Sequence, residues 1–166
     1  MPEILVYVLA AAAPMVVGAI WYNPNVFGNA WMKSVPITQE QIEGANMAVI
    51  FGVAYLFSLM ISFAITGFVI HQSAFESITF AEMEDGKLPE ETQAWLDDAQ
   101  ARFEGVHRSF GHGALHGAIM GVVFALPVLG TNALFERKKW KYILINAGYW
   151  IVSLAVMGGI ICQFKP

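Results

Sequence analysis

The chain has 166 residues, of which 57% are hydrophobic and 13% charged, and its formal net charge is −4. Average soluble domains are about 45–50% apolar and about 25% charged, so this surplus of apolar residues indicates a protein dissolved in lipid. The negative net charge argues against nucleic acid as a partner, because phosphate binding needs clustered lysine and arginine. The single cysteine, Cys162, excludes an internal disulfide and a cysteine-based metal motif.

Four stretches are apolar enough to cross a bilayer, which takes about 20 residues in a helix. They cover residues 4–22, 47–70, 113–134 and 142–164, and none has Asp, Glu, Lys or Arg in its interior. Because backbone polar groups cannot stay unpaired in lipid, each stretch is predicted to be helical. We therefore expect an all-α membrane protein, one polytopic domain over residues 1–166 with four transmembrane helices.

The segment 72–110, between the second and third spans, carries nine of the thirteen acidic residues. Pro89 followed by Glu90 and Glu91 is typical of a helix start. Apolar residues then recur at helical spacing, at Trp95, Ala99, Phe103, Val106 and Phe110. The pattern predicts an amphipathic extramembrane helix, which either lies on the membrane or extends the third span outwards.

The basic residues divide five against four between the two sides of the membrane. One side has Lys33, Arg137, Lys138, Lys139 and Lys141, and the other has Lys87, Arg102, Arg108 and Lys165. The tight cluster at 137–141 lies in a short loop, where positive charge favours the cytoplasmic side most strongly. Both termini and the acidic segment are therefore expected outside.

Small residues recur at every fourth position of the third span, at Ser109, Gly113, Gly117, Gly121 and Ala125. Helices in lipid associate through such stripes, because absent side chains let two backbones approach closely. The stripe predicts close packing through Gly113, Gly117 and Gly121 against a helix of the same chain or of another subunit. Gly52 in the second span and Gly158–Gly159 in the fourth are candidate counterparts.

The two halves of the chain match faintly at a constant offset. The matched pairs are Gly18 with Gly121, Pro24 with Pro127, Asn29 with Asn132 and Ala30 with Ala133. Each half is also a helical hairpin. These matches indicate either two parallel hairpin repeats, related by an axis along the membrane normal, or coincidence.

The histidines are the residues best suited to bind a metal ion or a proton. All four, His71, His107, His112 and His116, lie on the side of the acidic segment. His112 and His116 are four residues apart and project from one helix face. That pair suits a divalent metal ion, with His71 and carboxylates such as Glu76 or Glu104 completing the shell. The alternative is that these imidazoles hydrogen-bond across helices or meet lipid headgroups.

Several sequence runs carry a family resemblance. They are Gly18–Pro24 (GAIWYNP), Phe27–Lys33 (FGNAWMK), His112–Gly117 (HGALHG), Leu134–Arg137 (LFER) and Asn146–Trp150 (NAGYW). Together they resemble domain-of-unknown-function family 1761, over most of the chain apart from the acidic segment. The resemblance implies a multi-pass protein of the bacterial inner membrane, and it implies no activity.

Three interpretations of the function follow from these residues. No phosphate-binding glycine loop, Ser/His/Asp arrangement or HExxH motif is present, which disfavours an enzyme. The leading interpretation is a non-enzymatic protein that self-associates or serves as a subunit of a membrane complex, with lipid as its solvent. The first alternative is a metal- or proton-binding protein that uses His71, His112 and His116. The second is transport of a small solute, and a divalent metal is the one cofactor that the residues suggest.

Overall fold

The structure is a computed structural model that describes the backbone of residues 1–166 and every side chain except that of Gln39. Apart from an isolated bridge between Glu84 and Lys87, the regular elements in this described part are helices. In chain order they are α1 (Glu3–Trp21), η1 (Pro24–Gly28), α2 (Asn29–Met32), α3 (Gln39–Glu43), α4 (Met47–Val69), α5 (Ser73–Thr79), η2 (Phe80–Glu82), α6 (Glu90–Phe103), α7 (Phe110–Met120), η3 (Gly121–Ala125), α8 (Leu126–Phe135) and α9 (Trp140–Phe164).

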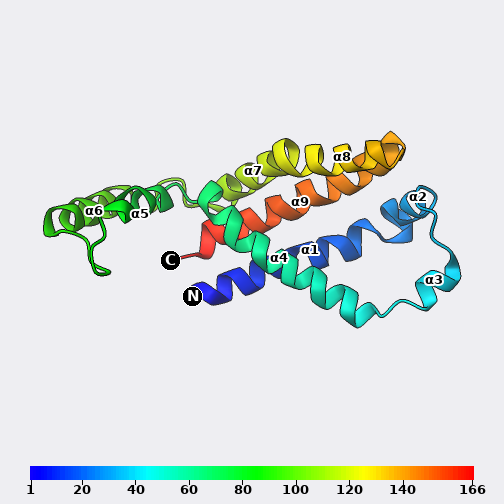
Figure 1. The fold of residues 1–166 in the computed structure, drawn as a ribbon, viewed down its shortest axis with the longest axis horizontal. Coiled ribbons are helices and arrows are strands. Elements are labelled where there is room, and N and C mark those ends of the chain that lie inside the picture. The colour runs from blue at the N-terminus through cyan, green and yellow to red at the C-terminus, as the bar shows by residue number, and fades with distance from the viewer.

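Four helices are long and apolar enough to span a membrane, which confirms the predicted all-α architecture. They are α1, α4, the continuous run α7–η3–α8, and α9 (Figure 1). The third span begins at Phe110, three residues before the predicted start, so it includes His112. Its π-helical turn η3 ends two residues before Pro127, whose missing amide hydrogen interrupts the regular hydrogen-bond ladder.

The helix α9 lies at the centre of the bundle and contacts the other three spans. Its buried residues include Met157 and Ile161, which belong to one core cluster with Val6 of α1 and Val69 of α4. The outer faces carry large exposed apolar side chains, such as Phe57. Such a surface is soluble in lipid, and the bundle is therefore built as a membrane protein.

The glycine stripe of α7 lies against α9 of the same chain. A Cβ atom added to Gly113 would overlap the carbonyl of Gly158, and one added to Gly117 would overlap the carbonyl of Leu154. A Cβ on Gly121 would lie 2.6 Å from Cα of Ile151. The two backbones therefore approach to a distance that only glycine permits.

Three other glycines were expected at the contact between α7 and its neighbour, and Gly52 is the one that lies outside it. Gly159 meets the ring of Phe110, at the start of α7. Gly52 of α4 has nothing within 4 Å of an added Cβ atom, so the idea that it pairs with the stripe is wrong. The reason is that α4 presents Gly52 outwards, on its exposed face.

Three hydrogen bonds join α1 to α9 at the basic end of the bundle. The indole of Trp21 donates to the carbonyl of Ile145 at 3.0 Å, and the hydroxyl of Tyr22 donates to Asn146 Oδ1 at 3.0 Å. Tyr149 donates to the carbonyl of Pro14 at 3.1 Å. Amphipathic aromatic residues therefore satisfy their polar atoms across the two helices while their rings stay in apolar surroundings.

The acidic segment folds as a helical hairpin outside the bundle. Helices α5 and α6 lie side by side and project beyond one end of the four spans (Figure 1). The ring of Phe75 on α5 packs against Trp95 and Phe103 of α6, with centroid separations of 6.1 and 5.8 Å. This small apolar contact joins the two helices of the hairpin.

The helix α6 begins at Glu90, directly after Pro89, but it is shorter than the apolar spacing predicts. It ends at Phe103, so Val106 and Phe110 do not continue it, and the single amphipathic helix expected through Phe110 is wrong there. Gly105 and His107 both have positive φ angles, of 73° and 59°. This left-handed backbone cannot continue a helix and turns the chain into α7.

Both chain termini lie at the same end of the bundle as the acidic hairpin (Figure 1). Lys165 Nζ is 3.1 Å from Glu3 Oε1, which joins the two ends of the chain. The guanidinium of Arg108 donates to the carbonyl of Lys165, next to the start of α7. The basic loop at 137–141 lies at the opposite end. The internal repeat stays a prediction.

Candidate functional site

His71 lies at the junction between the membrane span α4 and the extramembrane hairpin. The helix α4 ends at Val69, and Ile70 leaves it with an extended backbone (φ −116°, ψ 103°). Val69 and Ile70 are 1% and 3% exposed, which anchors the junction in the core, whereas His71 itself is exposed. The imidazole is therefore held at the edge of the bundle by the buried residues that precede it.

His112 and His116 project from the first two turns of α7. Ser109 caps this helix, because its hydroxyl oxygen accepts a hydrogen bond from the amide of His112 at 3.3 Å. Both imidazoles are half-buried, and their ring centroids are 4.5 Å apart. A rigid, capped helix thus presents two nitrogen ligands on one face.

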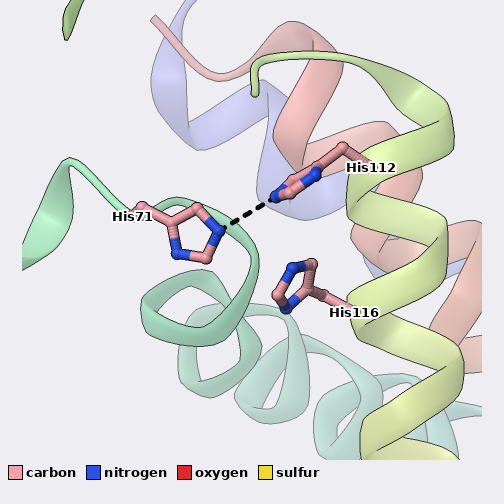
Figure 2. A group of neighbouring side chains, drawn as sticks. All are labelled: His71, His112 and His116. Atoms are coloured by element: carbon pink, nitrogen blue, oxygen red, sulfur yellow. Dashed lines mark hydrogen bonds between the residues drawn. The ribbon is translucent and has the colours of Figure 1, made fainter. Parts of the chain in front are cut away.

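The three imidazoles converge on one small volume (Figure 2). One ring nitrogen each of His71, His112 and His116 lies within 4.8 Å of the other two. His71 Nε2 and His112 Nε2 are 3.0 Å apart, a hydrogen bond in which one nitrogen donates and the other accepts. The ring of His71 also lies 4.9 Å from that of His116, between centroids.

The glycine crossing sets this convergence. A Cβ atom on Gly158 of α9 would meet both the carbonyl of Gly113 and, at 3.1 Å, Cγ1 of Val69. Gly158 of α9 is therefore the position at which both α4 and α7 pack against α9. Gly113 follows His112 directly and Val69 lies two residues before His71, so packing at this point brings the two imidazoles together.

His107 is a fourth imidazole at the edge of the cluster. Its ring stacks on His112 with a centroid separation of 4.8 Å and an interplanar angle of 17°. Its carbonyl accepts a hydrogen bond from the buried thiol of Cys162 at 3.3 Å. Its ring nitrogens do not belong to the convergent group of three, so we interpret His107 as a support for His112. Sequence spacing did not indicate this role, because the position of the His107 ring depends on the turn in which His107 has a positive φ angle.

The carboxylates expected to complete a metal shell lie elsewhere. Within the described residues, the convergent group contains three imidazoles and no acidic side chain. Glu76 and Glu104 instead line a neighbouring cavity of about 460 Å³, together with Gln72 and Arg108. The expectation that either carboxylate joins the histidines is wrong, because both belong to the hairpin beyond the turn at His71.

The arrangement suits two kinds of chemistry. Neutral imidazole is a preferred ligand of Zn²⁺, Cu²⁺ and Ni²⁺, and three such ligands leave a further coordination position open. A close imidazole pair also holds a proton between two nitrogens. Both chemistries use the same lone pairs, which only the neutral rings offer.

Comparison with known proteins identifies the family and nothing narrower. A family model described as "Protein of unknown function (DUF1761)" matches residues 5–162. No curated protein and no solved structure matches the chain. The match extends over nearly the whole chain, including all four spans and the three convergent histidines, and the chain therefore belongs to the DUF1761 family.

Proposed function

We propose that this protein is a multi-pass membrane protein that binds one divalent transition-metal ion through His71, His112 and His116. The observation that carries the proposal is the convergence of three imidazole nitrogens within 4.8 Å of one another. Two of them come from α7 and the third from the turn that follows α4, so the site is formed by the fold. A metal ion bound there would link α4 to α7.

The spacing of the nitrogens fits a zinc-like ion. Zinc–nitrogen distances of about 2.0–2.1 Å at tetrahedral angles place two ligand nitrogens about 3.3–3.4 Å apart. His71 Nε2 and His112 Nε2 lie 3.0 Å apart, and the widest separation in the group is 4.8 Å. These separations bracket the spacing that a tetrahedral ion requires.

The surrounding charge favours a cation. The acidic hairpin adjoins the cluster, and residues 72–110 contain nine acidic and three basic residues. An excess of negative charge raises the local concentration of cations near the site. Because no carboxylate belongs to the group within the described residues, the fourth position is left for water or an exchangeable group.

Metal titration of matched variants tests this function. The full chain in neutral detergent is titrated with Co²⁺, followed by absorption, and Zn²⁺ is then added as a competitor. We expect one ion per chain and a loss of affinity of about tenfold or more in His112→Asn, because one of three ligands is removed. His107→Asn is the comparison, since asparagine tolerates its left-handed backbone; its ring stacks on His112 but is outside the group, so this variant should lose less affinity than His112→Asn. Equal affinity in all three proteins would overturn the proposal.

Proton binding by the same cluster is a second candidate, favoured by the 3.0 Å contact between His71 and His112. Imidazole proton resonances distinguish it in metal-free protein. A pair that shares a proton gives a strongly downfield signal, which is lost in His71→Gln. Binding of one metal ion per chain would favour metal binding over proton binding as the role of the cluster.

Self-association and cellular orientation are further proposals. The glycine stripe is occupied by α9 within the chain, so support for a homo-oligomer or complex subunit comes from the exposed apolar outer faces alone. The bacterial inner membrane, with termini and acidic hairpin outside, is supported by the basic cluster at the other end of the bundle.

A further inference from the structure

We infer that the basic end of the bundle contains a second site, which binds the phosphate group of an anionic phospholipid. A cavity of about 360 Å³ lies there, at the opposite end from the histidines. Its lining consists of five basic residues together with Ala30 and Ser34. The basic residues are Lys33, Arg137, Lys138, Lys139 and Lys141.

Two loops far apart in the sequence form this cavity. Lys33 ends the short helix α2 of the first loop. Arg137, Lys138 and Lys139 belong to the tight connection between α8 and α9, where Arg137 takes a left-handed backbone with φ 57°, and Lys141 lies in the first turn of α9. The amide of Lys138 donates to the carbonyl of Ala133 at 2.8 Å, which closes the turn. The general preference for cytoplasmic lysine and arginine explains the side of the membrane, but it does not explain why both loops face one cavity.

Among the described residues, no ion pair involves the basic side chains of the cavity. In the described part of the molecule, the ion pairs join Arg102 to Asp98 and Lys165 to Glu3, all away from this end of the bundle. The nearest carboxylate in the sequence, Glu136, lines a different cavity, beside Asn146. Lys138 Nζ lies 5.7 Å from the ring centroid of Tyr142, a contact that leaves its charge in place. Like charges so close repel one another, and an anion relieves this repulsion.

The position of the cavity selects a lipid as the source of that anion. Phe135 is the last residue of α8 and Trp140 the first of α9, so they flank the basic connection in the chain, and their side chains are 87% and 67% exposed. Exposed aromatic rings at helix ends belong at the level of lipid headgroups. A phospholipid places its phosphate at this level and its apolar chains along these rings. Basic pockets between membrane helices recognise anionic headgroups in this way.

Lipid retention tests the inference. The full chain is purified in neutral detergent and mixed with phosphatidylglycerol, phosphatidylcholine or inorganic phosphate, and bound lipid is counted by native mass spectrometry. We expect wild type to retain phosphatidylglycerol in preference to phosphatidylcholine. In Lys33→Gln/Lys139→Gln, phosphatidylglycerol binding should weaken about thirtyfold, the loss expected of two basic side chains near anionic lipid.

Two further variants make the test specific. Lys87→Gln/Arg102→Gln changes the net charge equally at the other end of the molecule and should retain lipid as wild type does. Lys33→Arg/Lys139→Arg keeps both charges and should also retain it. Equal retention of the two lipids by wild type, or equal losses in the two glutamine variants, would overturn the inference. Competition by inorganic phosphate at equal concentration would show a site for a soluble anion and would also overturn it.

Discussion

At the scale of the residue, one rule of helix geometry and one rule of helix packing bring the three imidazoles together. His112 and His116 share a face because four residues make just over one helical turn. His71 joins them because Val69 packs on Gly158, beside Gly113. The first rule is visible in the sequence, whereas the second depends on a contact between three helices. His71 was already predicted as the third ligand, and this contact explains how it reaches the other two.

Acid should weaken metal binding at this cluster. Isolated imidazole titrates near pH 6.5, and its protonated form has no lone pair for a metal. Binding is therefore favoured at high pH and is lost as the pH falls. Between about pH 7.5 and about pH 5.5 we expect the Zn²⁺ affinity to fall by about tenfold or more, measured by titration in detergent. An affinity constant over this range would exclude histidine ligands.

At the scale of the element, the close crossing of α7 and α9 positions the site. The sequence predicted the stripe of small residues, because spacing along one helix is a local property. It left open which helix the stripe meets, since Gly52 and Gly158 are equally small. Only the packing shows that α9 receives it.

Replacing Gly117 tests this crossing. A leucine side chain at Gly117 would overlap the carbonyl of Leu154, so the two helices must separate. We expect Gly117→Leu to lower the free energy of unfolding by about 1–3 kcal/mol, measured by denaturant titration in detergent. Gly52→Leu is the matched control and should have little effect, because an added Cβ atom there meets nothing within 4 Å. Equal stability of the two variants would show that the crossing is not close.

Replacing Phe75 tests the hairpin of α5 and α6. Its ring packs between Trp95 and Phe103, so Phe75→Ala should destabilise the hairpin by about 1–2 kcal/mol, less than the loss of a fully buried phenylalanine. Hydrogen exchange should then accelerate in α5 and α6 while the four spans keep their protection. Phe80→Ala is the control, because the Phe80 side chain is 69% exposed. Unchanged exchange in Phe75→Ala would mean that other contacts hold the hairpin.

At the scale of the whole molecule, the two ends of the bundle differ in charge and chemistry. One end carries the histidines, both termini and the acidic hairpin, and the other carries the basic cavity. The four spans were predictable because hydropathy is summed along the chain. The path of the acidic segment was not, because the left-handed backbone at His107 broke an apparently continuous helical pattern. The meeting of Lys33 with the basic loop likewise depends on long-range packing.

Site-directed labelling tests the orientation of these two ends. In a Cys162→Ser background, a cysteine at Asp97 in the hairpin should react with an impermeant thiol reagent added to intact cells. A cysteine at Lys139 in the basic loop should react only after the membrane is permeabilised, because positive loops remain cytoplasmic. The opposite labelling pattern would reverse the orientation and leave the four spans unchanged.

The central claim is that His71, His112 and His116 together bind one metal ion. Zinc K-edge X-ray absorption on the detergent-purified chain, loaded with one equivalent of Zn²⁺, measures the ligands directly. We expect three imidazole nitrogens at about 2.0–2.1 Å and one further light atom. A shell of oxygen ligands alone, or one in which the imidazole signal is unchanged in His71→Gln, would contradict it.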